Sequence, residues 1–100
     1  MPTFVAKGIN VSCRTIEGEA FIFNHETKVL LQLDEVGSFV WDQIVGNQTI
    51  DDVLEECIKE FTGDVQEIRN SVKEFIYELF RKNVVTLSSE PPPEEMTSVC

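Results

Sequence analysis

Few residues of this chain have the types and spacing that catalysis or metal binding requires. His25 is the single histidine and lies in a predicted turn, where a solvated side chain is the expected role. Cys13 and Cys57 fall within apolar patterns that are typical of small core residues, and no group of cysteine and histidine has the spacing of a metal site. The glycines are scattered, without a run that could cradle phosphate. The sequence therefore predicts a protein that is not an enzyme, with no catalytic residue, no metal and no other cofactor.

The charge of the chain argues against two classes of partner. Eighteen acidic residues stand against eight basic ones, for a net charge of −10, and pairs such as Glu55-Glu56 and Glu94-Glu95 are expected to be solvated. Nucleic acids and anionic membranes are bound through positive charge on the protein. We therefore expect no nucleic acid and no membrane as partner, and we expect a partner with apolar or positive character.

Length and composition indicate one small domain. A chain of 100 residues with 42% apolar content can build one core, but it is too short to support a deep cofactor cavity easily. We expect a domain over residues 1–87 and a disordered tail over 88–100, because Pro91-Pro92-Pro93 and its acidic neighbours cannot form a core. Three cysteines without a CxxC pair do not suggest a disulfide framework. With no signal-peptide pattern and no membrane-spanning run, we expect a cytoplasmic protein.

Segments with the apolar periodicity of strands are followed along the chain by segments with that of helices. Residues 9–16, Glu19–Phe23 and Lys28–Leu33 read as three antiparallel strands, the last two joined by a turn. Asp34, Thr49 and Asp64 are good N-caps for three helices that end near Gly46, Gly63 and Lys82. Residues 84–87 read as a last short strand. This order predicts an α+β protein of the winged helix-turn-helix type, with Trp41 as a core anchor of the first helix.

The third predicted helix has a wide apolar arc with a basic margin. At 100° per residue its apolar side chains span about 140°, and Arg69 and Lys73 lie beside the Ile76 and Phe80 edge of that arc. One interpretation is a broad core face with two basic side chains that reach past it to solvent. The other is one wall of a groove for an extended peptide with apolar anchors and acidic side chains. The arc consists of Val65, Ile68, Val72, Phe75, Ile76, Leu79 and Phe80.

An ordered set of short patterns resembles the PqqD family, also called the RiPP recognition element. The set begins with Leu33-Asp34-Glu35-Val36-Gly37 after an acidic-start hairpin, continues with Val40-Trp41, and then has Gly46 with Thr49-Ile50. The weaker end of the pattern is met by Phe61, Phe75 and Leu79. The resemblance covers about residues 8–87 and extends to the stand-alone leader-binding half of split lasso-peptide B proteins.

The resemblance implies binding of the leader segment of a ribosomally made precursor peptide, without catalysis. The leader would add as a strand to the sheet edge beside the third helix, and a separate maturation enzyme (a leader peptidase, a cyclase or a radical-SAM enzyme) would act on the core peptide. The site residues carried over on the strand, or chosen on the helix from its apolar arc, are Lys28, Val29, Leu30, Leu31, Arg69, Val72, Lys73, Ile76 and Phe80.

Two other functions remain open from the sequence. A winged helix-turn-helix often binds DNA, although the net charge of −10 opposes it here. A small structural subunit could use the same strand edge to pair with a larger enzyme. The class of modified peptide (lasso, radical-SAM thioether or quinone-cofactor precursor) is not determined, and a monomer or a strand-swapped dimer is compatible with an exposed edge.

Overall fold

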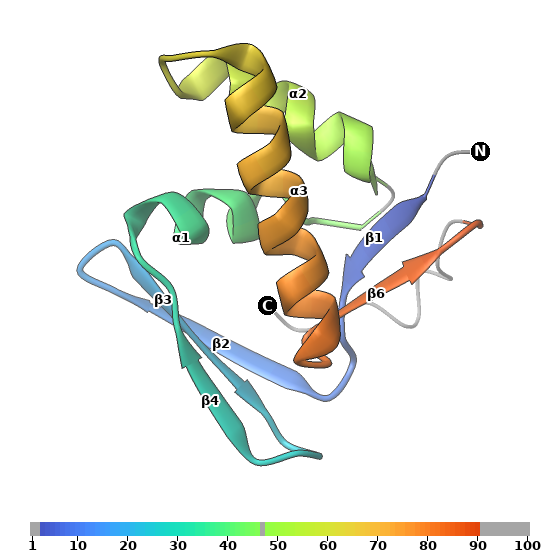
Figure 1. Ribbon diagram of the computed structural model, residues 1–100. Coiled ribbons are helices and arrows are strands. Elements are labelled where there is room, and N and C mark those ends of the chain that lie inside the picture. The colour runs from blue at the N-terminus through green and yellow to red at the C-terminus, as the bar shows by residue number, and fades with distance from the viewer. Residues whose placement is uncertain (1–2, 47, 91–100) are drawn as a thin grey trace.

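The computed structural model describes residues 3–46 and 48–90 and shows an α+β fold of six strands and three helices (Figure 1). The strands form two antiparallel three-stranded sheets, of order β2-β3-β4 and β5-β1-β6. The predicted sheet followed by three helices is confirmed, and a second sheet is added to it. In chain order the elements are β1 (Phe4–Lys7), β2 (Val11–Ile16), β3 (Glu19–Asn24), β4 (Val29–Gln32), α1 (Glu35–Asp42), β5 (Gln48–Thr49), α2 (Ile50–Glu60), α3 (Val65–Arg81) and β6 (Val85–Ser88).

The β3–β4 turn is built around the buried side chain of Asn24. Its Oδ1 accepts hydrogen bonds from the backbone N–H groups of Glu26 (2.8 Å) and Thr27 (3.0 Å). Its Nδ2 donates to the backbone oxygen of Asn83 at 2.7 Å, beyond the end of α3. One side chain therefore shapes the turn that leads into β4 and connects this turn to the C-terminal end of α3.

The second sheet joins the two ends of the described chain. In it β1 pairs with β6 from Phe4 opposite Ser88 to Lys7 opposite Val85, and with β5 on its other side. The predicted last strand is confirmed in β6, but the predicted domain boundary after Leu87 falls inside this strand. Of the predicted tail, residues 91–100 lie outside the described residues.

The three helices begin at the predicted caps. The Asp34 carboxylate accepts from the Gly37 N–H at 2.7 Å, and Asp64 accepts from the Glu67 N–H at 3.1 Å. Thr49 forms a capping box with Asp52 at the start of α2. These bonds satisfy backbone donors that a helix leaves free at its first turn, which is why short polar side chains mark the starts so well.

The core lies between the β2-β3-β4 sheet and the helices. Trp41 is almost fully buried, with Ile22, Ile44 and Ile76 among the other large buried side chains, so its predicted role as a core anchor is confirmed. The Nζ atom of Lys7 lies 4.8 Å from the centroid of the Trp41 ring. Burial lowers the pKa of Lys7, while the neighbouring Asp42 carboxylate opposes this shift. Figure 1 shows α3 crossing the molecule between the two sheets.

The cysteines differ in their states. Cys57 is a free, buried thiol of α2, as its apolar pattern predicted. Cys13 is disulfide-bonded, a bond that the odd cysteine count did not suggest. No helix in the described part of the chain is long and apolar enough to cross a membrane.

Candidate functional site

The outer edge of β4 is open. Among residues 3–46 and 48–90, β4 pairs only with β3, with Ile22 opposite Leu31, and the Leu33 N–H donates to the Ala20 oxygen at 2.8 Å. Backbone groups alternate in direction along an antiparallel strand. The amides of Leu31 and Leu33 therefore point toward β3, and the N–H and C=O groups of Leu30 and Gln32 point toward the open edge. The predicted position of this strand at a sheet edge agrees with the observed topology.

The four residues predicted on this strand occupy different positions. Lys28 lies in the turn before the strand, with a φ of 63° and its N–H bonded to the Asn24 oxygen, so the predicted strand start at Lys28 is wrong by one residue. Val29 and Leu31 are on the face that carries Ile22, and Leu31 packs against the core. Leu30 is 62% exposed on the opposite face, beside Phe23.

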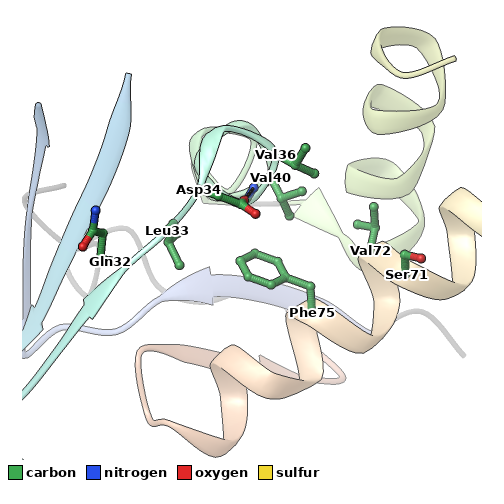
Figure 2. Close-up of a pocket in the computed structure, with 9 residues that line it drawn as sticks. Gln32, Leu33, Asp34, Val36, Val40, Ser71, Val72 and Phe75 are labelled. Carbon is green, nitrogen blue, oxygen red and sulfur yellow. Dashed lines mark hydrogen bonds between the residues drawn. The ribbon is translucent and has the colours of Figure 1, made fainter. Parts of the chain in front are cut away.

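A hollow of about 290 Å³ lies where β4 ends and α1 begins, with α3 as its other wall. Figure 2 shows the Phe75 ring extending from α3 toward Leu33 and the first turn of α1. The ring is half-buried, and its Cζ would lie 3.0 Å from a β-carbon added to Gly37. The lining is mostly apolar and consists of Gln32, Leu33, Asp34, Val36, Gly37, Val40, Ser71, Val72 and Phe75.

A second hollow of about 460 Å³ continues from the first toward the α2–α3 turn. The two hollows share Val36, Ser71 and Val72, so they adjoin one another, and together they are called the groove from here on. The groove starts at the open edge of β4 and ends beside the first turn of α3. Its second part is lined by Val36, Phe61, Thr62, Gly63, Asp64, Glu67, Ile68, Ser71 and Val72.

The rotation of α3 about its axis differs from the one expected if its basic margin formed a groove wall. Ile76 is fully buried in the core, and Arg69 points to α2, with its Nη2 3.9 Å from the Glu55 Oε1. Because Arg69, Lys73 and Phe80 lie about 160–180° around the helix from Ser71, they are on the side away from the groove. Of the five helix residues predicted for the site, the groove lining includes Val72 alone.

Sequence reasoning missed Ser71 and Phe75 as lining residues. Phe75 belongs to the apolar arc of α3, but it lies at the margin opposite the basic one. The available signal was Gly37, one turn into α1, where a missing side chain allows an aromatic ring of another helix to approach closely. Periodicity gives the width of an apolar arc but not the direction in which its margins point.

Neither Cys57 nor His25 is among the described residues that line the groove. Burial raises the pKa of the Cys57 thiol to about 11, which keeps it protonated at neutral pH. His25 lies in its predicted turn, where its Nε2 is 2.5 Å from the Ser12 Oγ and its ring contacts Phe23 edge-on. Within residues 3–46 and 48–90, no group of His, Cys, Asp and Glu side chains could hold a metal ion.

Comparison with known proteins places the chain in a family. The sequence model of the family described as coenzyme PQQ synthesis protein D (PqqD) matches residues 19–85, from β3 to the start of β6. The chain belongs to the PqqD family. This membership confirms the resemblance seen in the sequence, and it covers the open strand, all three helices and the whole groove. No curated protein matches the chain significantly.

Two solved structures of similar fold accompany this PqqD-family match. TbiB1, in complex with the TbiA(beta) leader peptide, superposes with a TM-score of 0.72 at 18% identity, covering 85% of this chain and 96% of that one. A lasso peptide synthetase B1 complexed with the leader peptide gives a TM-score of 0.71 at 8% identity, covering 82% of this chain and 96% of that one. At such low identity these similarities establish a shared fold.

Proposed function

We propose that this PqqD-family protein binds the leader segment of a ribosomally made precursor peptide, without acting on it chemically. The observation that carries the proposal is the open edge of β4 directly beside an apolar groove. Unpaired N–H and C=O groups give affinity for any extended peptide, and neighbouring pockets then select its side chains. Both structural neighbours were solved with leader peptides bound, which supports this use of the fold.

In the proposed complex the leader adds as a new strand to β4. Its backbone pairs with the outward groups of Leu30 and Gln32, and every second side chain turns toward the groove. There it meets Leu33, Val72 and the Phe75 ring, where apolar contact adds about 25 cal/mol for each Å² buried. Val29 and Leu31 share the face of the strand that looks toward the groove, so they border the same side chains.

Binding of the leader would serve a separate maturation enzyme. A precursor held by its leader keeps its core segment near any enzyme that contacts this protein, at an effective concentration in the millimolar range for a short flexible tether. The proposed role therefore requires affinity and release of the peptide, and the chemistry is left to the partner enzyme. The class of that enzyme follows from the precursor and not from this chain.

A backbone substitution on β4 tests the proposal. Leu30→Pro removes an N–H that points to the open edge, so it should leave the β3 pairing intact and block strand addition. Leu30→Ala is the matched control, because it removes the same side chain and keeps the N–H. The probe is the synthetic leader of the precursor encoded beside this protein, or, where none is encoded there, the best binder selected from a random linear-peptide display library.

The expected result is binding with a Kd between nanomolar and micromolar, about −8 to −12 kcal/mol, for the wild type and Leu30→Ala. Leu30→Pro should weaken it at least tenfold while its circular dichroism spectrum stays unchanged. Absence of binding by the wild type at 100 µM, about −5.5 kcal/mol, or equal binding by a folded Leu30→Pro variant, would overturn the proposal.

A further inference from the structure

The groove is lined mostly by apolar and small residues, and the charged residues of its lining are all acidic. Asp34 lines the hollow near β4, and Asp64 and Glu67 line the hollow near the α2–α3 turn. No lysine or arginine is among the described residues that line either hollow. The ion pairs formed by the described residues are Lys59 with Glu56, Arg69 with Glu55, and Arg81 with Glu78, so none of them neutralises a carboxylate of the groove.

The positive N-terminal ends of the helices at the groove do not outweigh its negative charge. α1 and α3 both begin there, and each helix N-terminus contributes about half a positive charge. Each of these ends is capped by a full negative charge, through Asp34 on α1 and Asp64 on α3. The sum at each cap remains negative, and Glu67 adds to it in the first turn of α3.

We propose that the peptide bound in this groove carries a basic side chain that lies at Asp64 and Glu67, in addition to an apolar side chain beside Phe75. The inference rests on the proposed function, because the groove itself is the binding site and its charges select the occupant. A lysine or arginine at that end gains an ion pair with the wall, whereas an aspartate or glutamate meets carboxylates on the same side.

For a peptide that runs along α3, the positions of these residues on the helix also set the spacing between the two side chains. Phe75 and Glu67 are eight positions apart on α3, which corresponds to about 12 Å along the helix axis. An extended peptide advances about 3.3 Å per residue. The basic side chain is therefore expected about four residues from the apolar one along the bound peptide.

Selection from a random linear-peptide display library tests this inference without knowledge of the natural precursor. Peptides retained by the immobilised full-length chain, and lost with Leu30→Pro, should be enriched in lysine and arginine about four residues from an aliphatic or aromatic residue. The best binder is then synthesised in three forms, with its basic residue kept, changed to glutamine or changed to glutamate. Affinity should fall in that order.

Charge-neutral variants of the protein complete the test. Asp64→Asn keeps a good N-cap while it removes the charge, and Glu67→Gln keeps the shape of the side chain. Each substitution should lower the affinity for the basic peptide by about 1.5- to 5-fold at low salt, the range of exposed ion pairs. The affinity for the glutamine form of the peptide should not change. Asp51→Asn is the matched control, because this carboxylate lies in the first turn of α2 outside the groove.

The outcomes separate the two proposals. The charge inference is overturned if the selected peptides depend on the β4 edge but are not enriched in basic residues. It is also overturned if they bind the Asp64→Asn and Glu67→Gln variants as tightly as the wild type. Both outcomes leave leader binding intact. If no peptide is retained through the β4 edge, strand addition fails and the charge inference fails with it. Enrichment together with selective loss in the neutral variants supports both.

Discussion

A β-carbon placed on Gly37 would lie 3.0 Å from Cζ of Phe75, so the tip of this ring from α3 packs directly against the backbone of α1. The ring of Phe75 closes the space between them and forms a wall of the groove. The absence of a side chain at Gly37 thus leaves the space that the Phe75 ring occupies.

Gly37→Ala is expected to disturb the groove more than the fold. Alanine gains up to about 1 kcal/mol over glycine inside a helix, while the new methyl group pushes the Phe75 ring by a few tenths of an ångström. We expect a free energy of unfolding within about 1 kcal/mol of wild type and a clear loss of peptide affinity. In a Phe75→Leu background, which lacks the Cζ atom, the same substitution should cost less affinity. Equal losses in both backgrounds would show that the two residues act independently.

Phe75 and Phe80 are expected to differ in their effect on peptide binding. Phe75→Ala removes a ring that lines the groove and should weaken binding about tenfold or more, as aromatic contacts at an interface often do. Phe80 is 44% exposed on the side of α3 away from the groove, so Phe80→Ala should change the affinity less than about twofold. Titration of both folded variants with the same fluorescent peptide measures the difference. The reverse order of effects would place the peptide on the Arg69 and Lys73 side of the helix.

Asn24→Ala is expected to destabilise the protein by about 2–4 kcal/mol. The side chain is buried and makes hydrogen bonds to Glu26, Thr27 and Asn83, and the alanine variant leaves their backbone groups without these partners. Urea unfolding followed by tryptophan fluorescence would give the change. Asn24→Asp keeps the acceptor for the turn and loses the donor to Asn83, so it should separate the turn from the contact with the end of α3. A change below about 0.5 kcal/mol for Asn24→Ala would contradict this role.

Cys57 is expected to make the stability fall at high pH. Its thiol pKa is raised from 9.0 to about 11 in the folded protein, so between these values the unfolded chain loses a proton that the native chain keeps. The stabilising contribution is therefore complete below pH about 9 and decreases as the pH rises toward 11, by up to about 2 kcal/mol. Cys57→Ala should show a shallower decline than wild type in urea unfolding across this range, because the other titrating groups are common to both. Parallel declines would show that burial does not perturb this thiol.

Local features of the sequence determined the elements and several of their ends. Asp34, Thr49 and Asp64 cap the three helices where their side-chain chemistry predicts it, because capping depends on neighbours only a few residues away. The β3–β4 hairpin follows for the same reason, and the burial of Trp41 follows from apolar periodicity. The order of the short patterns along the chain was also sufficient to indicate the PqqD family.

Only the tertiary structure decided the rotation of α3 and the pairing of the chain ends. An apolar arc of about 140° has two margins, and the packing of Phe75 against Gly37 and of Arg69 toward Glu55 determines which margin borders the groove. The pairing of β1 with β6 brings Phe4 beside Ser88, and no local pattern encodes a contact between residues so far apart. The physical reason is the same in both cases: helix and strand periods fix where side chains point relative to their own element, whereas long-range packing fixes where that element points.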